Sequence, residues 1–383
     1  MFLSIAKSNT QNPRDIIENK YADSKGRLYF YDNAKFILIF LVVLGHTISP
    51  FSEGGEGSLF FLFLWRMINV LHMPCMIFIS GFFAKSYIRR DGTINVQRPF
   101  TYAMYYVAAQ LFFMVFDAVV LDKSVAKTLL DPRSSLWFLV CLIWWHLLLP
   151  VINRINPKWM MIIAVAAGIL IGYDEKVGNF VSLSRMVVHF PFFLFGYYVS
   201  SDNMKFLTAK KAKIISIPLT LGASAVVALS IFLKEIAGVI NFSINKFITC
   251  NVDYFEIFED TGVSPLLWAV PRVCFYLCAV ALSFSFLVWA PRKKNIFTRF
   301  GARTLAVYIL HRCIYQAYRK FEWCDLEWLP GDNVFVLRLF MIVVAFLITL
   351  VLSLYPFYIP FELLGKIKIT GLIKKTVTES DKK

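Results

Sequence analysis

The chain of 383 residues is 58% hydrophobic and only 17% charged, whereas about a quarter of the residues in an average soluble domain are charged. Long apolar runs recur along the chain, which excludes an ordinary soluble enzyme and predicts a polytopic membrane protein. A net charge of +15 would suggest a nucleic-acid ligand in a soluble protein. Here the distribution of the charge gives a membrane explanation, so we expect no nucleic-acid partner.

Ten apolar runs follow one another, each near the ~20 residues that a helix needs to cross a bilayer. They cover residues 33–51, 59–84, 100–121, 136–153, 158–173, 186–200, 214–233, 265–290, 300–318 and 334–359. The sequence therefore predicts an all-α, polytopic membrane bundle of about ten transmembrane helices. We divide the chain into an N-terminal tail over 1–31, a transmembrane domain over 32–360 and a basic C-terminal tail over 361–383.

The basic residues are distributed unevenly between the connecting segments. With the N-terminus inside, the inner segments hold 25 of the 40 lysines and arginines, and the outer loops hold 9. Cytoplasmic loops of membrane proteins carry such an excess. The pattern predicts cytoplasmic termini and a multi-pass protein of the plasma membrane, and it accounts for most of the net charge.

The first apolar run has a lysine at its entrance and a histidine near its far end. Lys35 and His46 are eleven residues apart, so both fall on one helix face, roughly 16 Å apart along the axis. His46 follows Gly45, which allows a ligand or another backbone to approach closely. A neutral imidazole there can act as a general base on a hydroxyl. The alternative is an interfacial histidine bonded to a neighbouring helix.

The second run carries Arg66, Asn69 and His72, of which the last two share a helix face. This face either lines a cavity or forms hydrogen bonds between helices. A cluster of cations follows in a short loop predicted to be cytoplasmic: Lys85, Arg89, Arg90 and Arg98. Such a cluster usually only sets topology, but it also suits a phosphorylated ligand such as a nucleotide-bearing thioester.

Two later runs carry further candidates. Trp137 begins the fourth run at the predicted outer boundary, where it is typical of an aromatic belt. In the ninth run Thr304, Tyr308 and His311 form one polar stripe on an apolar helix. Three hydrogen-bonding groups on one face favour an interior filled by water or substrate over simple helix adhesion. The longest predicted outer loop, 234–264, mixes acidic and aromatic residues and is either a sugar-binding segment or a lid.

Several common chemistries have no motif in this sequence. The five histidines form neither His-x-x-His nor His-Glu-x-x-His, so we expect no bound metal. There is also no P-loop, no dinucleotide-binding glycine pattern and no Gly-x-Ser-x-Gly nucleophile turn. These absences leave two hypotheses: direct acyl transfer assisted by a base, or transport of a sugar or lipid-linked glycan without chemistry.

Four motifs in chain order resemble the acyltransferase type 3 family of integral membrane O-acyltransferases, which modify surface carbohydrates in bacteria. The resemblance spans residues 27 to about 358. The motifs are Asp32 with Lys35 and His46; His72-Met73-Pro74 leading into Phe78-Ile79-Ser80-Gly81-Phe82; Leu136-Trp137-Phe138-Leu139 with Phe190-Pro191-Phe192 and Gly196-Tyr197; and Gly301 through Tyr308-Ile309-Leu310-His311. Most members have arginine where Lys35 stands, and the Asp-Asn-x-Lys subgroup is similar to fucose O-acetyltransferases.

The resemblance implies a cytoplasmic acyl-CoA donor, often acetyl-CoA, a sugar hydroxyl as acceptor and His46 as the catalytic base. On this hypothesis the donor phosphates lie near Lys35 with Arg89, Arg90 and Arg98. The acceptor is bound by Arg66, Asn69, His72 and Trp137. A donor to the oxyanion is also needed, and Tyr308, His311 and Arg66 remain open for it.

Overall fold

The computed structural model describes residues 28–52, 58–89, 91–123, 128–175, 182–233, 241–250, 252–321 and 334–369. Within these ranges the chain is helical, with no β-strand and a single isolated bridge between Ile88 and Ile94. The all-α prediction is confirmed. The two predicted tails lie mostly outside the described residues, as does Arg90.

A helix overlaps each of the ten predicted runs. In chain order these helices are α1 (Tyr29–Ile48), α2 (Ser58–Ala84), α3 (Gln97–Val119), α4 (Trp137–Ile152), α5 (Pro157–Leu170), α6 (Leu183–Tyr198), α8 (Lys210–Ile231), α12 (Val270–Trp289), α14 (Thr304–Lys320) and α15 (Val334–Leu352). Shorter helices connect them: α7 (Ser201–Lys205), α10 (Asn241–Ile248), α11 (Phe255–Phe258), α13 (Thr298–Gly301) and α16 (Tyr355–Gly365).

Six of the described helical segments are long and apolar enough to cross a bilayer. They are Tyr29–Ser52, Leu59–Tyr87, Gln97–Val119, Lys210–Ile231, Pro265–Trp289 and Phe335–Leu352. The helices α4, α5, α6 and α14 have only 14 to 17 residues. The chain is therefore a helical membrane protein, while ten spans and cytoplasmic termini remain predictions.

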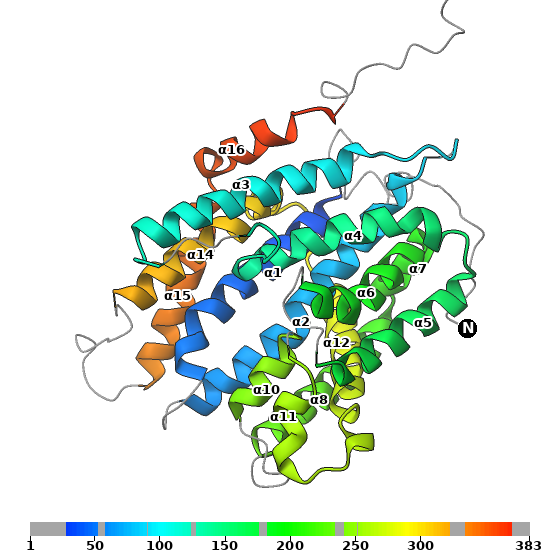
Figure 1. The fold of residues 1–383 in the computed structure, drawn as a ribbon, viewed down its shortest axis with the longest axis vertical. Helices are drawn as coiled ribbons and strands as arrows, with labels where there is room; N and C mark the ends of the chain where they lie inside the picture. The colour runs from blue at the N-terminus through cyan, green and yellow to red at the C-terminus, as the bar shows by residue number, and fades with distance from the viewer. Residues whose placement is uncertain are drawn as a thin grey trace, which may run out of the picture.

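The last predicted run is divided in the structure. We expected one helix to continue to residue 359, but α15 ends at Leu352 and α16 begins at Tyr355 after an extended Leu354. Pro356 lies in the first turn of α16, where its missing N–H costs no helical hydrogen bond. The chain turns at this point, and α16 then packs along α3 (Figure 1).

Helix α2 lies at the centre of the bundle, where it packs against α1, α6, α8 and α12 (Figure 1). Opposite faces of α2 take part in different apolar clusters. Phe61 and Ile68 pack into a core with α1, α3, α14 and α15, whereas Val70 and Ile77 pack into a core with α5, α6, α10 and α12. The two cores thus meet along α2.

The crossing of α2 and α6 depends on two glycines. A Cβ atom at Gly81 of α2 would overlap the carbonyl oxygen of Phe193, and one at Gly196 of α6 would overlap the carbonyl oxygen of Phe78. Small residues let helix backbones approach closely where lipid gives no hydrophobic drive for association. The motifs around Gly81 and Gly196 in the sequence therefore form one packing contact.

We predict that Gly81→Ala lowers the stability of the purified protein by about 1–3 kcal/mol, because overpacking forces the two backbones apart. Gly222→Ala in α8 is the matched control, since no atom lies within 4 Å of a Cβ at that position. Alanine favours a helix interior, so the control should be neutral or slightly stabilising. Unfolding in detergent measures both. Equal stability of the two variants would contradict the close crossing.

Candidate active site

The structure brings three aromatic side chains from α1 and α14 together around His46. The ring of His46 stacks on Tyr315 with 4.8 Å between centroids and 7° between planes. The ring of His311 lies 5.1 Å from His46 and 6.1 Å from Tyr315. His311 is buried, whereas His46 and Tyr315 keep part of their surface accessible. We call these three residues the histidine cluster.

The tautomer of His311 follows from its contact with the backbone. Its Nδ1 lies 2.8 Å from the carbonyl oxygen of Val307, and a carbonyl can only accept a hydrogen bond. In the neutral ring Nδ1 therefore carries the proton, and Nε2 presents its lone pair. This Nε2 is buried and has no hydrogen-bond partner among the described residues. As a neutral ring His311 thus offers a proton acceptor, not a donor to an oxyanion.

Tyr308 holds α14 against the chain that precedes α4. Its hydroxyl donates to the carbonyl oxygen of Ser135, and the hydroxyl of Ser135 donates to the carbonyl oxygen of Tyr308 at 3.5 Å. Its ring makes an edge contact with Phe138 at 5.9 Å. The Tyr308 hydroxyl, which we predicted as an oxyanion donor, thus forms a hydrogen bond that joins α14 to the start of α4.

Trp137 is the neighbour of Phe138 at the start of α4, and its ring packs against α6. Its ring lies 5.2 Å from that of His189, and the guanidinium carbon of Arg185 lies 5.3 Å from the indole centroid. Arg185 also donates through Nε to the carbonyl oxygen of Thr249 at 3.1 Å. Arg185 is thus held beside Trp137 by its contacts with that ring and with the residue that follows α10.

The three polar residues of α2 lie in two different environments. Asn69 lies near a Cβ position at Gly45, beside His46, and donates to the carbonyl oxygen of Trp65 at 2.8 Å. His72 contacts the carbonyl oxygen of Ile68 through Nδ1 at 2.6 Å. Arg66 instead bonds to α8 and α10.

Arg66 is fully buried and points toward the core that α2 forms with α5, α6, α10 and α12. Its Nε donates to Asn245 at 3.0 Å, and its Nη1 donates to the hydroxyl of Ser230 at 2.8 Å. These contacts join α2 to α8 and α10. The predictions of Arg66 as an acceptor-binding residue and as an oxyanion donor gain no geometric support from them.

The cations that we predicted to bind the donor make their contacts on different elements of the structure. Lys35 forms an ion pair with Asp32 at 2.9 Å near the start of α1. Arg98 instead donates to the carbonyl oxygen of Phe83 and to the hydroxyl of Ser86, at 2.8 and 2.6 Å. Arg89 is exposed in the adjoining turn. Arg90 lies outside the described residues. The contacts of Lys35 and Arg98 thus lie on different elements.

The start of α1 is held by the segment that links α12 to α14. Asn33 donates through Nδ2 to the carbonyl oxygens of Pro291 and Lys293, both at 2.9 Å. The hydroxyl of Thr298 donates to the side-chain oxygen of Asn33 at 2.7 Å. A Cβ atom at Gly301 would overlap the carbonyl oxygen of Asp32, so glycine is needed for this approach. These contacts fix the end of α1 that lies opposite His46.

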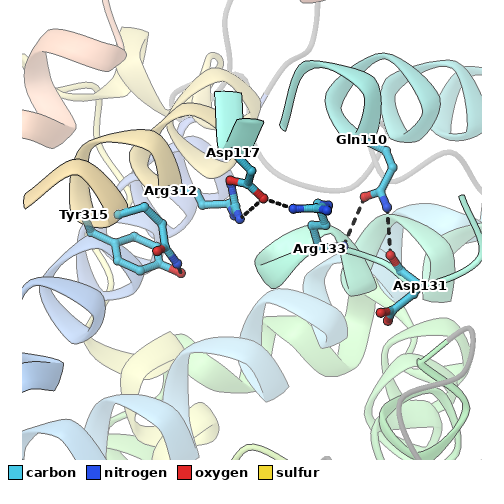
Figure 2. A network of polar contacts seen from close by, with 7 residues as sticks. Gln110, Asp117, Asp131, Arg133, Arg312 and Tyr315 are labelled. Atoms are coloured by element: carbon cyan, nitrogen blue, oxygen red, sulfur yellow. Dashed lines mark hydrogen bonds and ion pairs between the residues drawn. The ribbon is translucent and has the colours of Figure 1, made fainter. Parts of the chain in front are cut away.

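A buried ion network lies beside the histidine cluster (Figure 2). Asp117 of α3 is 1% exposed and receives two hydrogen bonds from Arg312, at 2.9 and 3.0 Å. It also pairs with Arg133. Gln110 orders the same segment by donating to the carbonyl oxygen of Asp131 at 2.7 Å and accepting from the backbone N–H of Arg133 at 3.1 Å. Since Arg312 follows His311 in α14, the network restricts the position of the cluster.

Sequence reasoning missed Tyr315, Arg185 and Asp117. Tyr315 extends the stripe of Tyr308 and His311 by one turn, so the helical period could have found it. Arg185 was counted as a loop cation, although it begins α6. Asp117 lies within an apolar run, and a lone charge in a membrane helix is a functional candidate by default.

No group of three or more histidine, cysteine, aspartate or glutamate side chains within the described part of the chain is arranged to hold a metal ion. The candidate site therefore consists of imidazoles, a phenol and nearby guanidinium groups. Imidazoles that accept protons, next to a fixed positive charge, suit proton removal from a hydroxyl and stabilisation of the negative charge that follows.

Comparison with protein families decides the class. The model described as an acyltransferase domain, of the acyltransferase type 3 group, matches residues 28–358 of this chain. The chain belongs to the acyltransferase type 3 family. The matched range includes every described residue of the histidine cluster and of the ion network, and it agrees with the resemblance that the motifs indicated.

One curated relative is the nodulation protein NolL of Mesorhizobium japonicum. It is 26% identical to this chain over 187 residues, which are 46% of this chain and 48% of the relative. The chain thus matches only about half the length of that relative. No solved structure matches this chain.

We predict that Asp117→Asn lowers the stability of the protein by about 3 kcal/mol or more, because it leaves Arg312 buried without its counter-charge. Asp122→Asn is the matched control: Asp122 also pairs with a basic residue of α14, Lys320, but both are largely exposed. Loss of an exposed pair costs at most about 1 kcal/mol. Unfolding of both variants in detergent tests this, and an equally large loss in Asp122→Asn would refute the role of burial.

Proposed function

We propose that this acyltransferase type 3 protein is a membrane O-acyltransferase. It moves an acyl group, in the first instance acetyl, from cytoplasmic acyl-CoA to a hydroxyl of a cell-surface or lipid-linked sugar in a bacterial plasma membrane. The observation that carries the proposal is the histidine cluster, in which the ring of His46 stacks on Tyr315 and lies 5.1 Å from the ring of His311, so that two imidazoles are adjacent. Family membership supports the acyl-transfer class.

In the proposed reaction His46 removes the proton from the acceptor hydroxyl. The oxygen then attacks the thioester carbonyl, and the C–S bond breaks as the C–O ester bond forms. The CoA thiolate leaves and takes the proton from His46, so no further reactant is consumed. A positioned general base of this kind contributes about 10²–10⁴-fold to the rate. Tyr315 holds the ring of His46 in place, and His311 presents a second proton acceptor beside it.

Negative charge develops on the thioester oxygen during the attack, and a fixed positive charge stabilises it best where water is excluded. We assign this task to Arg185, whose guanidinium is held over Trp137 and whose Nε donates to the carbonyl oxygen of Thr249. Trp137, Asn69 and His72 then line the acceptor side. This replaces the earlier candidates Tyr308 and Arg66, whose polar groups join helices in the structure.

The test is transfer of radiolabelled acetyl groups from acetyl-CoA to a sugar acceptor by protein purified in detergent. We predict that His46→Ala lowers transfer by at least about 10²-fold, because the base is lost. His146→Phe is the matched control. His146 is a buried histidine of α4 among Tyr87, Tyr102 and Phe193, where an aromatic ring preserves the packing, and it is no part of the proposed site.

Full transfer by a correctly folded His46→Ala variant would contradict the role of His46. Ester formation by the wild-type protein also separates this proposal from the alternative that the sequence left open, because a transporter without chemistry forms no ester. Absence of any ester with acetyl-CoA and a panel of sugar acceptors would count against the proposed reaction.

A further inference from the structure

A cavity of about 250 Å³ lies between α2, α8, α10, α11 and α12, at the end of the bundle where α10 and α11 connect α8 to α12 (Figure 1). Among the described residues that line it, Ser230 alone carries a hydroxyl, amide or charged group. That hydroxyl donates to the carbonyl oxygen of Val227 at 2.6 Å and accepts from Nη1 of Arg66 at 2.8 Å. The cavity therefore offers a ligand apolar contacts and almost no hydrogen bonds.

The cavity opens between α8 and α12. Val226 and Leu229 of α8 and Val270 of α12 line it and are 42%, 55% and 49% exposed. Both helices belong to segments that are long and apolar enough to cross a membrane, Lys210–Ile231 and Pro265–Trp289. Exposed apolar side chains on such segments contact lipid. Hydrocarbon chains of the bilayer thus reach the mouth of the cavity without crossing a polar barrier.

The inner wall of the cavity comes from α10, which is held in place by polar contacts. Ile244 and Phe247 of this helix line the cavity and are buried. Asn245 of the same helix accepts a hydrogen bond from Nε of Arg66 at 3.0 Å. The guanidinium carbon of Arg272 lies 4.2 Å from the ring centroid of Phe247. These contacts fix α10 over the cavity, so the space is a built feature of the helix packing.

An empty space of this size with an apolar wall is unfavourable. Its lining loses packing contacts, and the cost of a void grows with its volume. Water does not relieve this cost, because a buried water needs two to four polar partners, and the described wall supplies only the hydroxyl of Ser230. A hydrocarbon chain restores the packing contacts and needs no hydrogen bond.

We propose that this cavity binds one acyl chain of a bilayer phospholipid, which enters between α8 and α12 and ends beneath α10. The cavity is smaller than the about 300–1,000 Å³ of sites that enclose a whole small molecule, so one chain segment fills it and the headgroup stays outside. Because the wall has no group that selects a headgroup, the most abundant lipid of the bilayer is the occupant. This site is independent of the reaction proposed for the histidine cluster.

Photolabelling in nanodiscs tests the site. The probe is phosphatidylethanolamine with a diazirine near the end of one acyl chain, and peptide mass spectrometry locates the label. We expect label on Ile244, Phe247 or Ile248 of α10, because these residues are buried and a chain reaches them from inside the cavity. A probe with the diazirine in its headgroup should not label α10. No label on α10 from the chain probe, or equal label from both probes, would overturn the assignment.

Two variants reduce the cavity from different sides. Cys274→Phe places a ring in the space, and Val226→Trp narrows the mouth from an exposed position on α8. We expect each to lower the label on α10 about tenfold, because the void that favours entry of the chain shrinks. Leu277→Trp is the matched control, since Leu277 is 66% exposed on α12 and does not line the cavity. It should be labelled like the wild type. Undiminished label on α10 in both cavity variants would show that the probe arrives by another route and would refute the site.

Polyprenyl phosphate, added as a minor component of the nanodisc, tests the alternative occupant, the chain of a lipid-linked sugar. If the cavity takes phospholipid chains, the label on α10 stays the same. If the minor component removes most of the label, the cavity prefers an isoprenoid chain and the phospholipid assignment is wrong.

Discussion

The contacts of Asn33 with the segment 291–298 fix the N-terminal end of α1, and the rest of the account depends on that placement. The carbonyl oxygen of Asp32 lies so close to Gly301 that α1 and α13 cannot shift against each other without a clash. At its other end α1 presents His46 to α14. The helix α1 therefore joins this anchored end to the proton-accepting cluster.

A second constraint comes from the lack of water in the bilayer, where every polar group must find a partner within the protein. Asp117 satisfies it through Arg312 and Arg133, and the buried histidines satisfy it by directing Nδ1 at a carbonyl oxygen one turn earlier in their own helix. The contact between Nδ1 and the carbonyl oxygen has a chemical consequence. Because Nδ1 carries the proton in the neutral ring, the lone pair that can accept a proton is on Nε2. Anchoring the ring and preparing it to accept a proton are thus the same interaction.

The sequence predicted well what is decided locally. The apolar runs located the helices, and the spacing of Lys35 and His46 placed both on one face of α1. It failed where contacts between distant elements decide. Arg66 shares a helix with Asn69 and His72, but packing against α8 and α10 draws it to the other core. Arg98 is one of a local group of cations, yet it binds the end of α2. The pairing of His46 with Tyr315 depends on α14 lying beside α1, which no local pattern encodes.

The central claim is that an acyl donor presents its acyl group at the histidine cluster, where His46 acts as the base. A photoreactive acyl-CoA analogue with a diazirine in the acyl chain, followed by peptide mass spectrometry, tests it most directly. We predict that the label is found on the peptides that contain His46 or His311. A label in the core around Arg66 would contradict the account.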